Sequence, residues 1–222
     1  MKAKQIISYA ILLLLVPAAI VLGFLIFGSG GFIYSILAVS VLVCAAFFLS
    51  FEKSSHKSGV ILILAVMVAL SVASRFIPYV NPMSALIIIT AMYFGAQAGF
   101  ITGAMSALVS NFFFSQGPWT PFQMFAWGTI GFIAGLLCKP LKKSKILLAL
   151  FGAFSGIVFS LFMDVLTVLW QDGYFNASRY LAVLYTALPF TALYAVTNTV
   201  FLLLLSRPIG NKLDRIKTKY GL

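Results

Sequence analysis

The sequence is short of charged residues, and of acidic residues above all. Only 9% of its 222 residues are charged, with 4 Asp and Glu against 15 Lys and Arg, whereas 62% are hydrophobic. Soluble domains carry about 25% charged residues, so this composition excludes that class and predicts a protein that crosses a membrane several times. A cation excess can also mark a nucleic-acid binder. Here the Lys and Arg residues lie between apolar runs or at the C-terminus, where they indicate membrane topology.

Residues that build catalytic and metal sites are scarce as well. The chain has one His and two Cys, and Cys44 and Cys138 both lie inside apolar segments. That placement predicts packing roles and excludes a disulfide framework or a thiolate metal site. The sequence contains no Gly-x-x-x-x-Gly-Lys-Ser/Thr loop for nucleotide phosphates and no Gly-x-Ser-x-Gly elbow. We therefore expect no enzyme activity, no cofactor and no ATPase within this chain.

Long apolar runs are what the sequence has in abundance. A helix needs about 20 apolar residues to cross a bilayer, so the sequence predicts an all-helical integral membrane protein with eight spans. We place them at residues 6–27, 32–51, 59–77, 82–97, 99–115, 120–138, 145–171 and 180–205. The first is longer than a secretion signal and continues through any cleavage point, so we expect it to be retained.

The positions of the cations predict the orientation of these spans, because Lys and Arg favour cytoplasmic loops. With the N-terminus inside, only Arg75 and Arg179 are left outside. An even number of spans then returns the basic tail to the cytoplasm. We therefore expect a multi-pass protein of the plasma or inner membrane with both termini cytoplasmic. The Gly- and Pro-containing turn "SQGPWTP", residues 115–121, faces outward in this topology.

Polar side chains inside the spans gather in their predicted outer halves. Ser160, Asp164 and Thr167 form one helical stripe, and Gln123 and Trp127 share a face of another span. Several spans thus bring polar and aromatic groups to one depth, which is typical of a ligand pocket.

Asp164 has three open interpretations. An acid near the centre of a span carries a penalty of about 2.5–3.5 kcal/mol, so such residues face a protein interior or a wet cavity. Asp164 could contact a ligand, pair with Arg75 or relay protons. The last of these would make the chain a proton-coupled secondary carrier.

Small residues recur every four positions, a spacing that lets helix backbones approach closely. We expect this packing inside the protein for the pairs Gly95 and Gly99, Gly99 and Gly103, Gly131 and Gly135, and Gly152 and Gly156. Ala65, Ala69 and Ala73 form a further smooth face on the third span, and that face could receive a helix of another protein.

Residues 59–207 resemble the substrate-binding S-component of energy-coupling factor (ECF) vitamin importers. The resemblance is carried by the series Ala65-x-x-x-Ala69, the external turn "FFFSQGPWTPFQM" and the inner loop "KPLKKSK". It implies a six-helix core that takes a vitamin from outside and topples within the membrane against a transmembrane coupling subunit driven by two ATPase subunits. It also implies that Ala65, Ala69 and Ala73 dock that subunit.

By location, the resemblance implies a vitamin pocket lined by Asn111, Gln116, Trp119, Gln123, Trp127, Asp164, Trp170 and Tyr185. Residues 1–58, with two additional N-terminal spans and a cytoplasmic loop, depart from the six-helix pattern, and residues 208–222 form a basic tail. The external turn slightly favours cobalamin or another corrinoid over thiamine, riboflavin, pantothenate or a queuosine precursor. Besides the importer, two alternatives stay open: the secondary carrier using Asp164 and a membrane-embedded transferase.

Overall fold

The computed structural model describes residues 2–27, 32–51, 57–78, 80–172 and 174–221, and these form helices joined by short turns. The predicted all-helical class is therefore confirmed. The inner loop expected at 52–56 lies outside the described residues. The helices are α1 (Lys2–Ala10), the π-helical turn η1 (Ile11–Leu15), α2 (Val16–Phe27), α3 (Phe32–Phe51), α4 (Lys57–Ser74), α5 (Met83–Phe94), α6 (Ala96–Phe114), α7 (Trp119–Leu136), α8 (Cys138–Lys143), α9 (Lys145–Asp172) and α10 (Ala177–Tyr220).

Several of these helices have the apolar character of membrane spans. Three described segments are long and apolar enough to cross a bilayer by length and composition: Ile6–Gly23, Lys145–Asp172 and Ala177–Tyr220. Gly59–Ser74 and Met83–Phe94 are shorter apolar helices. The number of eight spans and the cytoplasmic termini stay predictions. The last helix runs well past the predicted end at residue 205, with Pro208 inside it, and so includes most of the basic tail.

Helices α6 and α7 form the tightest pair of the central bundle, and glycine makes their approach possible. A Cβ atom at Gly99 would overlap the backbone of Gly131, and one at Gly103 would overlap the backbone of Trp127. Close packing through these glycines is confirmed. Gly95 has a different role. Its φ of 89° separates helix α5 from helix α6, and a Cβ at this position would meet nothing within 4 Å.

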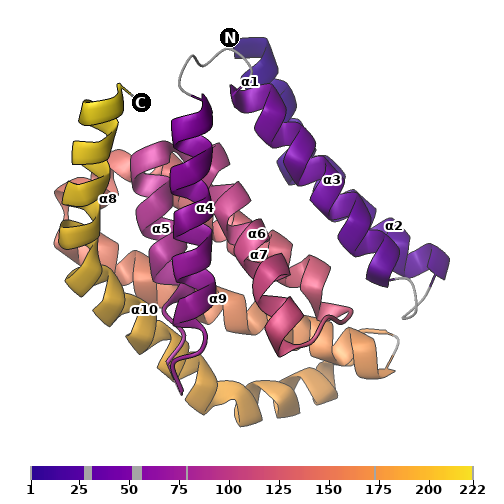
Figure 1. The fold of residues 1–222 in the computed structure, drawn as a ribbon. Coiled ribbons are helices and arrows are strands. Elements are labelled where there is room, and N and C mark those ends of the chain that lie inside the picture. Colours follow the sequence, from indigo (N-terminus) through magenta and orange to yellow (C-terminus); the bar gives the residue numbers. More distant parts are fainter. Residues whose placement is uncertain (1, 28–31, 52–56, 79, 173, 222) are drawn as a thin grey trace.

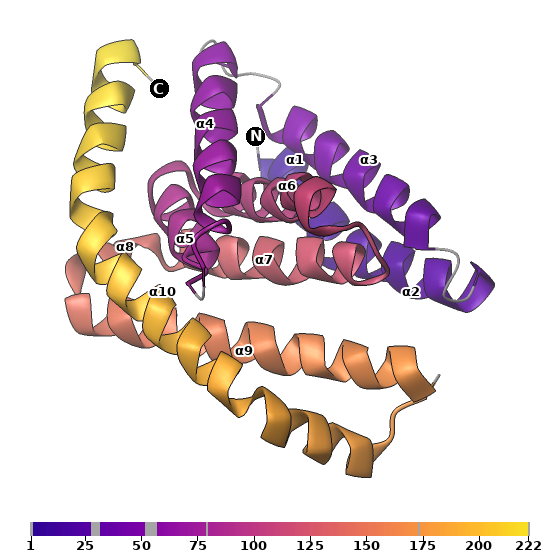
Figure 2. The ribbon, with the colours of Figure 1, turned by 60° about the horizontal axis from the view of Figure 1, so that its bottom comes forward.

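Helices α9 and α10 form a long hairpin that curves around one side of the bundle (Figures 1 and 2). Gly152 and Gly156 lie against the backbone of α10, which confirms their predicted packing role. The turn between the helices is held by an ion pair of 2.6 Å between Arg179 Nε and Asp172 Oδ1.

The two additional N-terminal helices lean against α6 and α7, on the other side of the bundle from α10 (Figure 1). The Tyr9 ring meets the Phe132 ring of α7 edge-on at 4.9 Å. The π-helical segment η1 lies just before Pro17, which has no backbone N–H to donate within a helix. At the end of η1, Val16 N–H donates to Ile11 O, the i→i−5 hydrogen bond of a π-helix.

Candidate functional site

Buried polar side chains of α6 and α7 meet a half-buried arginine at one end of the bundle, where α4 ends and α7 begins. Arg75 follows α4 directly, and its Nη1 donates to Ser110 Oγ and Asn111 Oδ1, both at 2.7 Å. Asn111 is fully buried, and its Nδ2 donates to Thr120 Oγ1 at 2.8 Å and to Gln123 Oε1 at 2.9 Å. We call Arg75, Ser110, Asn111, Thr120 and Gln123 the polar network.

An aromatic surface borders the polar network. Trp127 lies one turn beyond Gln123 on α7 and is 2% exposed, and its Nε1 donates to Ser84 Oγ at 3.1 Å. Its ring stacks on Phe159 of α9, with 4.4 Å between centroids and 17° between planes. The Arg75 guanidinium lies 5.6 Å from the Trp127 ring centroid, within cation–π range. A cation, two amides and a flat aromatic stack therefore share one location.

Tyr194 of α10 borders the same region, where its ring meets the Phe159 ring edge-on at 5.9 Å. Asp164 lies on α9, five residues beyond Phe159. Asp164 is 8% exposed, and its Oδ2 has no hydrogen-bond partner among the described residues. Buried acceptors are rarely left unpaired, so this oxygen is unusual among the described residues. No ion pair joins Asp164 to Arg75 in the described part of the chain, so the pairing considered from the sequence is not formed.

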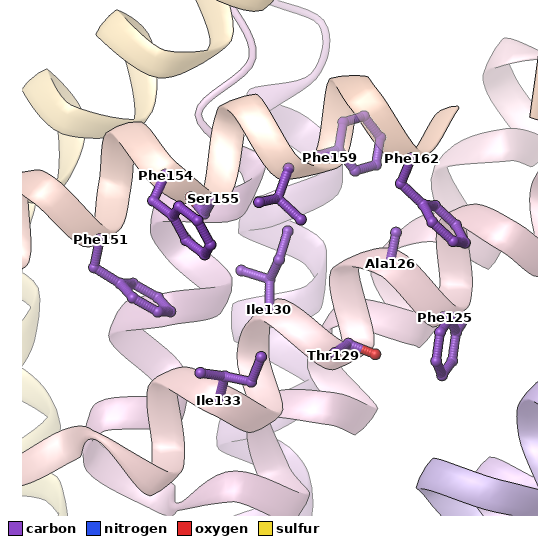
Figure 3. A pocket seen from close by; sticks show the side chains of 11 residues that line it. Phe125, Ala126, Thr129, Ile130, Ile133, Phe151, Phe154, Ser155, Phe159 and Phe162 are labelled. Carbon is purple, nitrogen blue, oxygen red and sulfur yellow. The ribbon is translucent and has the colours of Figure 1, made fainter. Parts of the chain in front are cut away.

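An apolar cavity of about 120 Å³ lies between α7 and α9, beside the aromatic stack (Figure 3). Its lining includes five phenylalanines, and Phe159 belongs both to this lining and to the stack on Trp127. Thr129 contributes a buried hydroxyl without a partner among the described residues. The site thus has a polar end at Asn111 and an apolar end between α7 and α9, with Phe159 at their junction.

The structure brings together three of the eight predicted pocket residues, since Asn111 is hydrogen-bonded to Gln123 and Trp127 lies one turn further along α7. Asp164 forms no hydrogen bond or ion pair with them in the described part of the chain. The other four form no hydrogen bond to the polar network in the described part of the chain. Gln116 Nε2 donates to Leu108 O, which holds the turn between α6 and α7, and Trp119 Nε1 donates to Ser115 O. The side chains of Trp170 and Tyr185 are 42% and 78% exposed.

Besides Arg75, the predicted pocket lacked five members of the site: Ser84, Ser110, Thr120, Phe159 and Tyr194. The sequence analysis considers Arg75 only as a partner of Asp164. Arg75 is, however, one of the two cations expected on the outer side of the membrane, and this unusual position could have marked it as a site residue. Phe159 and Tyr194 carry no such signal among 22 Phe and 9 Tyr residues.

The predicted docking face lies on a different surface from the site. Ala65, Ala69 and Ala73 are all exposed along α4, beside exposed Leu62 and Leu70. Within the described residues, no other helix covers this face.

Comparison with known proteins identifies the family. The family model for the S component of ECF-type riboflavin transporters matches residues 55–214, well over half of the chain. No curated protein and no solved structure matches. The matched region contains the whole site and the alanine face, and the N-terminal helices α1 to α3 lie outside it. S components are membrane proteins that bind the substrate of a vitamin transporter and are not enzymes, in agreement with the expected function class. The chain belongs to the family of ECF-type riboflavin transporter S components.

Proposed function

We propose that this chain is the substrate-binding subunit of an ATP-driven importer, and that its substrate is riboflavin or a vitamin with a similarly flat heteroaromatic ring. The observation that carries the proposal is the polar network at the edge of the stack between Trp127 and Phe159. The flavin ring has the same two-sided character, since its tricyclic surface stacks and one edge carries two carbonyl oxygens around an N–H group.

Each part of the site has a role in this binding mode. Arg75 and the amide nitrogen of Gln123 donate to the carbonyl oxygens, because amide nitrogens and guanidinium groups are donors. Asn111 gives both of its amide hydrogens to Thr120 and Gln123, so its role is to hold Gln123 in position. Asp164 Oδ2, which lacks a partner among the described residues, accepts from the ring N–H. Trp127 and Phe159 stack on the ring, and aromatic pairs of this kind contribute about 0.5–1.5 kcal/mol beyond area burial.

The binding mode requires the aromatic stack to open. The cavity of about 120 Å³ is smaller than the roughly 300–1,000 Å³ typical of ligand pockets. Rotation of Phe159 away from Trp127 would join the cavity to the polar network and admit a flat ring between α7 and α9. A corrin with its axial groups is much bulkier than a flavin ring. We therefore propose riboflavin in place of the cobalamin that the sequence slightly favoured.

Accumulation of the vitamin needs a partner, because no nucleotide-binding loop exists in this sequence. A protein that only binds its ligand can raise the ligand concentration on one side of a membrane only with a partner. That partner must bind the loaded and the empty protein with different affinities. We propose that a transmembrane coupling subunit with two ATPase subunits supplies this energy and docks on Ala65, Ala69 and Ala73. Small residues suit such docking, since helix association within lipid depends on close packing.

A calorimetric titration of the purified protein with riboflavin, thiamine, pantothenate and cobalamin tests the substrate. We expect saturable binding of riboflavin at one site and no saturation by the other three. Tight binding of cobalamin without binding of riboflavin would reverse the substrate assignment.

The unpaired oxygen of Asp164 is the one observation that favours the secondary carrier. Riboflavin uptake measured with an uncoupler, while ATP is maintained, separates the two mechanisms. We expect uptake to continue under these conditions. Loss of uptake there, or normal uptake in cells lacking every ECF coupling subunit, would establish the carrier instead.

A further inference from the structure

An apolar groove lies at the opposite end of the bundle from the polar network. Its walls are the first turns of α4, including Leu62 and Val66, and the last turns of α10, including Leu213, Ile216 and Tyr220, and its volume is about 430 Å³. Figures 1 and 2 show these two helix ends side by side. Helix α10 is held against α5 rather than α4 here, since Lys217 Nζ donates to Tyr93 O at 2.8 Å.

The groove is short and its lining is mostly hydrocarbon. Along α4 the lining runs from Gly59 to Met67, which is about 12 Å of helix or two turns. The aliphatic side chains of Leu62, Val66 and Ile216 give it the chemistry of a contact for part of a lipid acyl chain.

The charges around the groove favour an anionic occupant. Lys212 precedes Ile216 by four residues and Lys219 follows it by three, so both flank Ile216 on the same side of α10. Both lysines are exposed, and Asp214 is the one acidic residue of this part of the helix. The predicted topology places this end at the cytoplasmic side, where the leaflet carries anionic lipids.

We propose that the groove binds an anionic phospholipid of the cytoplasmic leaflet. One acyl chain lies along Leu62, Val66 and Ile216, and the phosphate lies between Lys212 and Lys219. The site is separate from the vitamin pocket, because the two lie at opposite ends of the bundle. It borders the alanine face through Leu62 and Val66, so the bound lipid would lie beside a partner docked on that face.

Native mass spectrometry of the detergent-purified protein, titrated with phosphatidylglycerol and with phosphatidylcholine, tests this site. We expect one tightly held phosphatidylglycerol. Each lysine near an anionic lipid contributes roughly fivefold to binding, so a Lys212→Gln and Lys219→Gln double variant should bind phosphatidylglycerol about 30-fold more weakly. Val66→Trp should fill the groove and prevent retention of either lipid.

A Lys139→Gln and Lys143→Gln double variant is the matched control, since it removes the same charge from exposed positions of α8, outside the groove lining. It should retain phosphatidylglycerol at the wild-type level. Equal binding of the two lipids by the wild type, retention by Val66→Trp, or an equal loss in the α8 variant would overturn the proposal. These measurements do not involve riboflavin, so their failure is distinguishable from failure of the vitamin assignment.

Discussion

Replacing Trp127 with alanine tests the aromatic part of the pocket. The variant removes the ring that stacks on Phe159 at 4.4 Å and that lies 5.6 Å from the Arg75 guanidinium. If the flavin ring stacks there, the lost contact is worth very roughly 1–3 kcal/mol, which corresponds to 5- to 150-fold weaker binding of riboflavin. Trp127→Phe keeps a stacking surface, so we expect a loss of only a few fold. Calorimetry on the purified proteins measures the riboflavin affinity of both variants.

Stability must be separated from affinity in this experiment, because Trp127 is 2% exposed and truncation of a buried aromatic residue costs about 3–5 kcal/mol of folding free energy. Phe132→Ala is the matched control. Phe132 lies on the same helix, is 3% exposed and packs against Tyr9, away from the polar network. It should lower the unfolding temperature comparably and leave riboflavin affinity unchanged. Wild-type affinity in folded Trp127→Ala, or an equal loss in Phe132→Ala, would refute the stacking role.

Three further variants test other parts of the account. Asp164→Asn keeps an acceptor but removes its charge, so riboflavin should bind about fivefold more weakly by calorimetry, and unchanged affinity would remove Asp164 from the site. Ala69→Trp holds a partner helix away from α4, so riboflavin binding should stay normal while uptake and copurification with a coupling subunit are lost; full uptake would disprove the docking face. Gly131→Val forces α6 and α7 apart, since a Cβ at residue 131 overlaps the Gly99 backbone, and we expect a lower unfolding temperature than the exposed control Ile133→Val gives. Equal unfolding temperatures would contradict the glycine packing.

The helices could be predicted well from the sequence because each is an apolar run bounded by Gly, Pro or charge. The turn at Pro118 follows from local backbone chemistry. The break at Gly95 was not predicted, because residue 95 was expected inside the span 82–97. The end of α10 could not be predicted this way. The apolar run stops near residue 205, but the helix continues because Leu213 is buried and Lys217 is held by Tyr93, and both contacts are tertiary.

The site was only partly predictable, because helical periodicity shows which residues share a face and leaves open which face turns inward. Gln123 and Trp127 are one turn apart on α7, and that face proved to be the buried one. Trp170 and Tyr185 were predicted to lie at the same depth in the membrane as Gln123 and Trp127, but their side chains are exposed. Phe159 joins the site through its tertiary stack on Trp127 of α7. Tyr194 joins it because glycines in α9 bring α10 close, as at Gly156, where a Cβ would meet the Tyr194 backbone.

A structure of the protein with riboflavin bound is the most direct test of the central claim. The account predicts the flavin ring between α7 and α9, with its centroid about 4.5–7 Å from that of Trp127 and its carbonyl edge within hydrogen-bonding distance of Arg75 and Gln123. Riboflavin bound elsewhere, such as at the exposed Trp170 and Tyr185, with the stack of Trp127 on Phe159 unchanged, would contradict it.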